Sequence, residues 1–381
     1  MREWIALNMT PGIGPRAAAK LLERFGSPTA VFGALRVELE QLKIRPEAVE
    51  SIMTRNLFGR AETELERVRA LGGDILLLDD GVYPALLREI FDPPLTLYVK
   101  GAWAAASDAP CVGFVGSRRC STYGLNVAES MARELAARGV TIVSGLARGI
   151  DAAAHRGALA AGGRTIAVMA TGLDDIYPPE HKKLAADIIA NGGALVTQFP
   201  LETPPLPENF PYRNRIISGL SLGVVVVEAT ERSGSLITAR LALEQDREVF
   251  AVPGSVNSST SFGTNYLIKS AGAKLIQQWQ DIAQELPAEI AARLLPPEPS
   301  KKKAAKEAKT KPQPSIVTLP ADLPADERGL FELLSADEPS HIDELSMRGG
   351  LSIPQLTGVL LNLEMRELKR QLPGKRFVRK L

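Results

Sequence analysis

The sequence has few residues of the kinds that build disulfide frameworks and metal sites. Only two of its 381 residues are cysteine, Cys111 and Cys120, and only three are histidine. Two cysteines in a chain of this length do not make a disulfide framework, which favours a reducing compartment such as the cytoplasm. Because the cysteines and histidines are few and scattered, we expect no structural zinc site, and no other metal or cofactor is indicated.

The chain also lacks long apolar runs and an excess of charge of one sign. Its most apolar stretch, residues 222–229, is far shorter than the ~18 apolar residues of a membrane helix. The N-terminal residues do not resemble a signal peptide, because they lack a long apolar core and a small-residue cleavage site. Lys and Arg (45) balance Asp and Glu (44). Any contact with nucleic acid therefore requires basic residues that are gathered locally.

What is present is enough apolar sequence for two or three globular domains. Residues 1–80 read as a small helical domain, with helices at 17–25, 28–36 and 59–71. From 81 to 286, short apolar runs alternate with helical stretches. This pattern predicts a Rossmann-like, doubly wound, mostly parallel α/β sheet with helices on both faces. The strands are expected at 75–80, 111–115, 140–144, 164–171, 194–197, 223–229, 248–254 and 273–276. The helices are expected at 122–138, 151–161, 180–190, 211–220, 235–246 and 263–271.

The C-terminal part divides into a linker and a small domain. Residues 287–320 are rich in Pro and Lys and read as a flexible linker, either a solvated tether or a contributor to phosphate attraction. Residues 321–381 predict winged-helix architecture, with helices at 326–334, 340–347 and 353–368 and a hairpin turning at Pro373-Gly374. Six basic side chains there can meet duplex phosphates: Arg366, Lys369, Arg370, Lys375, Arg376 and Arg379. The last helix carries few base-reading side chains, which favours a partner-binding or tethering role over gene regulation.

The segment 11–26, PGIGPRAAAKLLERFG, places a tight turn at the start of a helix. Gly12-Ile13-Gly14 can expose backbone N–H groups to a phosphate, as in helix-hairpin-helix elements that bind DNA without sequence preference. A purely structural turn in a helical domain fits the segment equally well.

Loops after two predicted strands carry residues suited to phosphate. In VGSR (115–118), Gly116 allows close backbone approach, Ser117 supplies a hydroxyl and Arg118 supplies a planar guanidinium. In SGLARGIDAAAH (144–155), Ser144 shapes the turn and Arg148 can reach the same rim. Asp151 and His155 lie one helical turn apart, which permits acid–base chemistry, but capping by Asp151 and packing of His155 is the favoured interpretation.

Two further segments follow the same logic. Pro211 is expected to start a helix whose first turn holds Arg213, Asn214 and Arg215. The two arginines are not on one helical face, so both reach one ligand only if that turn is irregular. Between the strand at 223–229 and the next helix lie hydroxyl, glycine and basic residues that can cradle a phosphate: Arg232, Ser233, Gly234, Ser235 and Thr238. Ser235 can also cap that helix.

A Gly/Ser-rich loop, 251–273, lies at one more predicted strand end, with Gly263-Thr264-Asn265 opening a helix. Four aromatic residues lie in or beside these loops, where they can stack on bases, although core packing is the favoured role for some of them. They are Tyr177, Phe210, Tyr212 and Phe262. Each loop alone is a weak signal, and the prediction rests on their convergence into one basic rim.

These segments resemble the bacterial DNA-processing protein A (Smf) family. The resemblance covers VGSR, SGLARGIDAAAH, TGLDDIYPPEH, FPYRNRIISGLS, SGSLITARLALEQ, VFAVPG and GTNYLI, in order, over nearly all of residues 81–275. It implies a non-enzymatic protein of the bacterial cytoplasm that binds single-stranded DNA in natural transformation and recombination. Such proteins work beside single-strand-binding protein, help load a RecA-type recombinase and form homodimers through the Rossmann-like domain. It also implies phosphate binding by Arg118 and a basic contribution from Lys182, although segment 197–210 departs from the family pattern.

An enzyme acting on a nucleotide or phosphoribosyl group is the alternative, since this sheet architecture also hosts such activities. The sequence shows no nucleophile elbow, metal cluster or P-loop to support it. Glu228 is the best-placed carboxylate at a strand end, and no partner acid or base is evident from the sequence.

Overall fold

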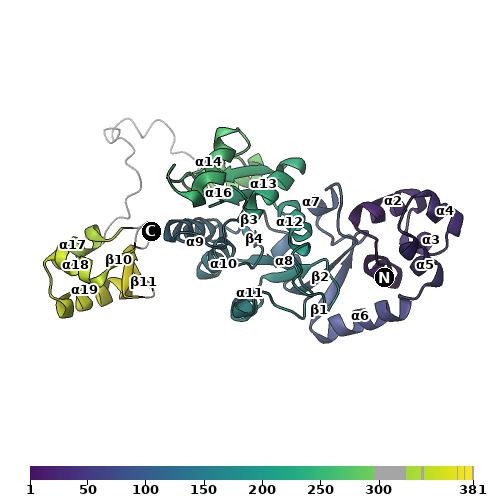
Figure 1. The fold of residues 1–381 in the computed structure, drawn as a ribbon, viewed down its shortest axis with the longest axis horizontal. Coiled ribbons are helices and arrows are strands. Elements are labelled where there is room, and N and C mark those ends of the chain that lie inside the picture. The colour runs from purple at the N-terminus through teal and green to yellow at the C-terminus, as the bar shows by residue number, and fades with distance from the viewer. Residues whose placement is uncertain (296–322, 336–338, 367, 373, 380–381) are drawn as a thin grey trace.

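The computed structural model describes residues 1–295, 323–335, 339–366, 368–372 and 374–379. A helical module, a central sheet covered by helices and a small helix-and-hairpin unit follow one another along the longest axis (Figure 1). Residues 296–320 of the expected linker lie outside the described residues, as does Pro373 of the expected hairpin turn. The described start of the linker region forms helix α16 (Ala288–Leu294).

The N-terminal module is wholly helical. Its helices are α1 (Arg2–Met9), α2 (Pro15–Phe25), α3 (Pro28–Val31), α4 (Arg36–Gln41), α5 (Pro46–Thr54) and α6 (Phe58–Ala70). The single helix expected at 28–36 is wrong, because two short helices occupy this region. The chain turns between them, and the Glu38 carboxylate accepts from the Leu35 N–H (2.9 Å) to begin α4.

The central sheet has nine strands in the order β1-β2-β6-β5-β4-β3-β7-β8-β9. They are β1 (Gly73–Leu77), β2 (Thr96–Gly101), β3 (Cys111–Val115), β4 (Thr141–Ser144), β5 (Thr165–Val168), β6 (Ala194–Thr197), β7 (Gly223–Val226), β8 (Glu248–Ala251) and β9 (Lys274–Leu275). The seven strands from β6 to β9 are parallel, which confirms the predicted fold class. Strands β1 and β2 form an antiparallel extension at one edge. Strand β2 was not predicted.

Helices cover both faces of the sheet because the central strands are apolar on both sides. On one face, β3 buries Val112 and Phe114 in the cluster that includes α9 (Thr122–Ala136) and α10 (Ile150–Ala160). On the other face, Val115 packs in the cluster that includes α12 (Asn209–Leu220) and α13 (Gly234–Glu244). The remaining helices of this unit are α7 (Ala85–Arg88), α8 (Trp103–Ser107), α11 (Lys182–Ala190), α14 (Phe262–Lys269) and α15 (Trp279–Ala283).

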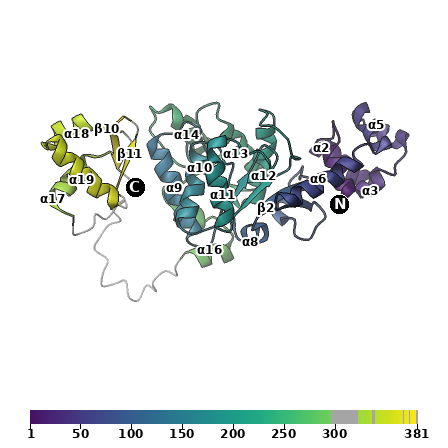
Figure 2. The same ribbon diagram turned by 90° about the horizontal axis from the view of Figure 1, so that it is seen from below.

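The C-terminal unit has the three helices and the hairpin of a winged helix, as predicted. Its elements are α17 (Ala325–Leu333), β10 (Ser340–His341), α18 (Ile342–Gly349), α19 (Ile353–Met365), β11 (Lys369–Leu372) and β12 (Arg376–Arg379). The unit has its own apolar core. Its hairpin faces α9 (Figure 2), where Arg370 pairs with Glu129 (2.8 Å) and Asn126 donates to the Arg379 carbonyl (3.4 Å).

No helix within the described residues is long and apolar enough to span a membrane.

A candidate phosphate-binding pocket at the sheet edge

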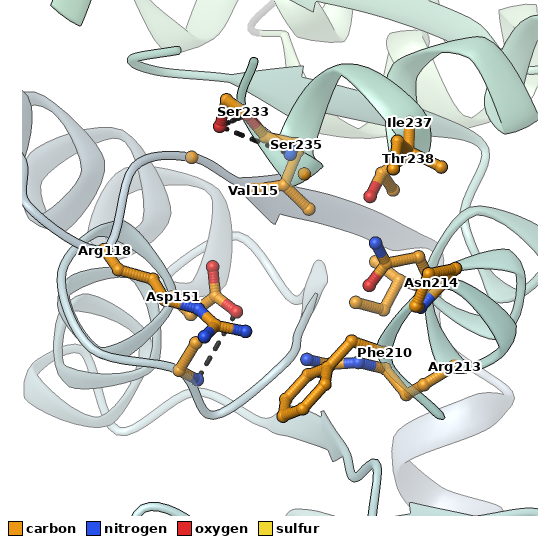
Figure 3. Close-up of a pocket in the computed structure, with 15 residues that line it drawn as sticks. Val115, Arg118, Asp151, Phe210, Arg213, Asn214, Ser233, Ser235, Ile237 and Thr238 are labelled. Atoms are coloured by element: carbon orange, nitrogen blue, oxygen red, sulfur yellow. Dashed lines mark hydrogen bonds between the residues drawn. The ribbon is translucent and has the colours of Figure 1, made fainter. Parts of the chain in front are cut away.

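A cavity of about 120 Å³ opens where β3, β4 and β7 end, between the N-terminal turns of α10, α12 and α13 (Figure 3). We call it the phosphate pocket. Arg118, Arg213 and Ser235 come from three separate loops or helices, and the structure brings all three to this cavity. Of the predicted site residues, the cavity is lined by Gly116, Arg118, Arg213, Asn214, Ser233, Gly234, Ser235 and Thr238. Its wall also contains Asp151, Phe210 and Ile237.

The loop after β3 is held in place by hydrogen bonds to Glu228. Ser117 donates its backbone N–H to the Glu228 carbonyl (2.8 Å), and Ser121 donates its own to the Glu228 carboxylate (2.8 Å). Gly116 is packed so closely that a Cβ there would lie 2.5 Å from Ile150. Only glycine fits this approach of the loop to α10. Glu228 therefore acts as a buried anchor for the loop that presents Arg118.

Arg118 is the exposed cation of the pocket. Its guanidinium lies 4.7 Å from the centroid of the Phe210 ring, a stacking distance for a cation on an aromatic face. Within the described part of the chain it forms no salt bridge. Arg118 therefore retains donors for an anion in the cavity.

Arg213 is the buried cation, with a side chain 3% exposed. Its Nη1 donates to the Val168 carbonyl (2.5 Å) at the end of β5. The guanidinium packs against Gly145 so tightly that a Cβ there would lie 1.8 Å from Nη1. Burial lowers the pKa of Arg213 to about 10, opposed by the nearby Asp151. The group therefore remains charged at neutral pH.

Asp151 lies in the first turn of α10, but it does not cap that helix as expected. Its Oδ2 accepts from the backbone N–H groups of Gly145 (3.1 Å) and Ala147 (3.4 Å), which belong to the loop before the helix. Burial raises the pKa of Asp151, while the charge of Arg213 and these two hydrogen bonds oppose the shift. The carboxylate thus clamps the loop that packs on Arg213.

His155 packs inside the protein, as expected, and does not reach the cavity. Its Nδ1 lies 2.7 Å from Thr165 Oγ1, whose own hydrogen goes to the Ile142 carbonyl (2.6 Å). Because that hydroxyl has no second hydrogen, Nδ1 must be the donor. Nε2 is then buried without a hydrogen-bond partner. Burial is the main reason that the pKa of His155 falls to about 3.

The first turn of α13 supplies hydroxyl groups and the backbone N–H of Gly234, which has no hydrogen-bond partner among the described residues. Ser233, not Ser235, caps this helix, accepting from the Ser235 N–H at 3.4 Å. The two hydroxyls are 2.8 Å apart. The positive end of the α13 dipole therefore faces the cavity together with two hydroxyls, an arrangement that favours an anion.

Helix α12 corrects the expectation for its two arginines. It begins at Asn209, two residues before Pro211, and its first turn is regular. Arg213 and Arg215 consequently leave the helix toward different sides. Arg215 is buried, donates to the Asp92 carbonyl and to Gln198 Oε1, and does not line the phosphate pocket.

The other predicted residues lie beside or beneath the cavity rather than in it. Arg148 pairs with Glu180 and shares a small adjoining hollow with Arg118, Tyr177 and Phe210. Ser144 is fully buried and donates to the Phe114 carbonyl (2.6 Å). Ser117 is buried beneath the loop, while Lys182 and Arg232 are exposed outside the cavity.

Three contributors escaped sequence reasoning in these roles: Glu228 as loop anchor, Asp151 as loop clamp and Gly145 as the seat of Arg213. Their signal in the sequence was their place: Glu228 and Gly145 follow β7 and β4, and Asp151 lies in the first turn of the helix after β4. Their hydrogen bonds join distant segments, such as Ser121 and Glu228, which lie 107 residues apart. Two cations, hydroxyls and a helix N-terminus around one small cavity suit a phosphate group.

Comparison with known sequences identifies two matching families. Residues 74–287 match the family described as DNA recombination-mediator protein A, and residues 311–375 match the DprA winged helix domain. Protein Smf of Escherichia coli K12 is 43% identical over 298 residues, which cover 78% of this chain and 75% of that protein. DNA processing protein DprA of Bacillus subtilis is 46% identical over 223 residues, 58% of this chain and 74% of the relative.

Two solved structures have the same fold. DNA processing protein A of Streptococcus pneumoniae superposes with a TM-score of 0.66 at 35% identity, covering 75% of this chain and 98% of its own. The Helicobacter pylori protein gives a TM-score of 0.50 at 33% identity, covering 55% of this chain and 93% of its own. That structure was determined to describe the single-stranded DNA binding mode of the H. pylori protein.

Proposed function

The chain belongs to the DNA recombination-mediator protein A family, and from this premise we propose that it binds single-stranded DNA through the phosphate pocket. The observation that carries the proposal is the convergence of Arg118, Arg213 and the α13 N-terminus on one cavity. A DNA phosphate in this cavity would receive hydrogen bonds from the Arg118 guanidinium, the Gly234 N–H and the Ser235 hydroxyl.

The geometry favours contacts to the backbone rather than to base edges. The pocket offers cations, N–H groups and hydroxyls, all suited to phosphate, so affinity should depend little on sequence and fall with added salt. Phe210 lies between Arg118 and Tyr177, with the two rings 6.1 Å apart and nearly edge to face. A base beside the bound phosphate can stack on this cluster.

Within the proposal, the predicted residues have different tasks. Arg148, Lys182 and Arg232 lie outside the phosphate pocket and attract the flanking phosphates of the strand. Ser117, Ser144 and Arg215 act from inside the protein, where they hold the loops and α12 in shape.

We propose that the protein also interacts with other proteins that bind single-stranded DNA. A recombination mediator hands single-stranded DNA to a RecA-type recombinase in the cytoplasm, and beside single-strand-binding protein it protects incoming DNA during transformation. We also infer a homodimer through the Rossmann-like domain. Phe262 and Tyr266 lie one turn apart and exposed on α14, and Leu275 is exposed on the edge strand β9. Covering these apolar side chains would stabilise a pair of subunits.

We infer that the pocket binds without catalysis. Asp151 and Glu228 accept backbone N–H groups, and His155 is buried away from the cavity. The acidic side chains near the pocket are thus engaged in holding loops. Release of free base or phosphate from nucleotides incubated with the pure protein would contradict this inference.

The test is a titration of fluorescent oligo-dT and of a mixed-sequence single strand with the Arg118→Ala variant. We expect affinity for both strands to fall about 30-fold, as for loss of about 2 kcal/mol of charge-assisted hydrogen bonding. Arg164→Ala is the matched control. Arg164 is exposed and directly precedes β5, so it lies at the amino-terminal ends of the parallel strands, whereas the phosphate pocket lies at their carboxyl ends. Unchanged affinity in Arg118→Ala would refute the assignment of the pocket.

A further inference from the structure

The first turns of α12 separate two cavities. Phe210, Arg213 and Asn214 line the phosphate pocket. A second cavity, of about 260 Å³, is lined by Asn209, Tyr212 and Arg215 from another face of the same helix. This division follows from the regular start of the helix, because positions three or four apart share one face.

The second cavity lies between the sheet unit and the helical module, and we call it the junction cavity. The module contributes Ile13 and Gly14 of the turn before α2, and the sheet unit contributes Phe199 and Pro200 after β6. Three contacts fix these walls to each other: Asn8 to the Gln198 carbonyl (3.2 Å), the Leu201 N–H to Glu64 (2.6 Å) and Arg67 to Glu202 (2.7 Å). The glycine turn at 12–14 thus forms a wall of a defined cavity.

The chemistry of the junction cavity suits a nucleobase better than a phosphate. Its walls combine apolar and aromatic side chains with the polar groups of Asn8, Gln198 and Asn209. Phe199 is half-buried and Tyr212 is 49% exposed. Arg215 donates to Gln198 Oε1, which leaves the Gln198 amide nitrogen without a hydrogen-bond partner among the described residues. A cleft that combines an exposed ring and apolar side chains with a few fixed hydrogen-bonding groups is the usual form of a site for a flat heterocycle.

We propose that the junction cavity receives a base of the same DNA strand whose phosphate occupies the phosphate pocket. This inference rests on the proposed function. Pro211 and Tyr212 form the exposed ridge between the two cavities. A helix is about 10–12 Å across and stacked nucleotides are about 3.4 Å apart, so about three or four nucleotides bridge the ridge. The helical module thereby becomes part of the DNA site and lengthens it.

The test measures affinity for oligo-dT strands of increasing length with Tyr212→Ala and Tyr212→Phe. Strands too short to cross the ridge should bind Tyr212→Ala as they bind the unaltered protein. Longer strands should bind it about five- to a hundredfold more weakly, the range for one lost base stack. Tyr212→Phe keeps the ring and should keep the affinity. A length profile of Tyr212→Ala that matches the unaltered protein overturns the inference.

A second variant fills the cavity and leaves the ring in place. A Cβ on Gly14 meets no atom within 4 Å and its φ is −90°, so Gly14→Leu is accommodated and projects toward the cavity. It should reproduce the loss for long strands only. Gly59→Leu is the matched control, because Gly59 is exposed on α6 and equally open. Equal binding of long strands by Gly14→Leu and Gly59→Leu contradicts the inference.

Two further outcomes distinguish a failure of this inference from a failure of the proposed function. If dTMP binds the unaltered protein but not Tyr212→Ala, while the length profile is unchanged, the cavity serves a free nucleotide and the inference fails. If Arg118→Ala still weakens short and long strands alike, the proposed function stands. If Arg118→Ala has no effect, the proposed function itself fails.

Discussion

The phosphate pocket and the winged-helix unit both contain basic residues, but several of those in the winged-helix unit are paired with carboxylates. In the C-terminal unit, Lys369 pairs with Glu364 and Arg366 with Glu327, while Arg370 pairs with Glu129 on α9. Helix α19 occupies the position of a recognition helix. It contains no Lys or Arg and exposes Leu361 and Met365. Arg118, in contrast, forms no salt bridge among the described residues. Lys375 and Arg376 of the C-terminal unit likewise form no salt bridge among the described residues, so the phosphate pocket differs in that Arg118 and Arg213 line one cavity together with the start of α13.

The largest expected effect is on the free energy of unfolding, and it comes from replacing one glycine in each of the two regions. Gly145→Ala places a Cβ 1.8 Å from Arg213 Nη1, so either the loop or the arginine must move. We expect the free energy of unfolding to fall by about 3 kcal/mol and DNA affinity to fall with it. Gly358→Ala in α19 meets no atom within 4 Å and should raise stability by up to about 1 kcal/mol. Urea unfolding of both variants measures the difference, and equal effects would contradict the packing described.

A smaller effect is the loss of stability of the sheet unit in acid. In the folded sheet unit His155 has a pKa lowered to about 3, whereas in the unfolded chain it takes up a proton near pH 6.5. The unfolded state thus binds more protons, so stability is lost as pH falls from 6.5 toward 3. Between pH 7 and pH 5 the expected loss is about 2 kcal/mol.

Tryptophan fluorescence follows this transition selectively. Trp4, Trp103 and Trp279 lie in the first two units, and the C-terminal unit contains none. His155→Asn retains a donor toward Thr165 and does not titrate, so its unfolding free energy should depend less steeply on pH. An unchanged slope in this variant would show that His155 does not carry the acid sensitivity.

The smallest effect concerns the winged-helix unit itself. Deleting residues 321–381 removes the contacts of Arg370 and Arg379 with α9 and, among the described residues, none of the lining of the phosphate pocket. We expect affinity for single-stranded DNA to change less than about threefold, since none of the described residues of this unit lines the phosphate pocket and ion pairs such as Arg370–Glu129 contribute little. A gel-shift titration of the truncated protein checks this. A tenfold loss would move part of the DNA site into this unit.

Much of the fold was predictable because it depends on local patterns. The continuous apolar runs at 111–115 and 223–226 are strands buried on both faces, and their alternation with helices fixed the parallel order. Strand β2 was overlooked because its TLYVKG sequence is short and follows two prolines, although Thr, Tyr and Val are strand formers. Its pairing with β6 is a contact between residues about 100 apart and has no local signature.

The candidate site was predictable in its loops but not in the direction of its side chains. VGSR and SGS were located because they follow strands in a parallel sheet. The spacing of Arg213 and Arg215 already placed them on different faces. Where α12 begins decided which of them faces the pocket, and that start is set by packing of Asn209, which donates to the Ala170 and Pro204 carbonyls. The roles of Asp151 and Glu228 likewise depend on neighbours distant in sequence.

The central claim is that the phosphate pocket holds a phosphate of single-stranded DNA. The most direct measurement is a crystal structure of the protein with bound oligo-dT. We expect a backbone phosphate within hydrogen-bonding distance of the Arg118 guanidinium, the Gly234 N–H and the Ser235 hydroxyl. A strand bound along α19, or anywhere that leaves Arg118 and Ser235 without a phosphate, would contradict it.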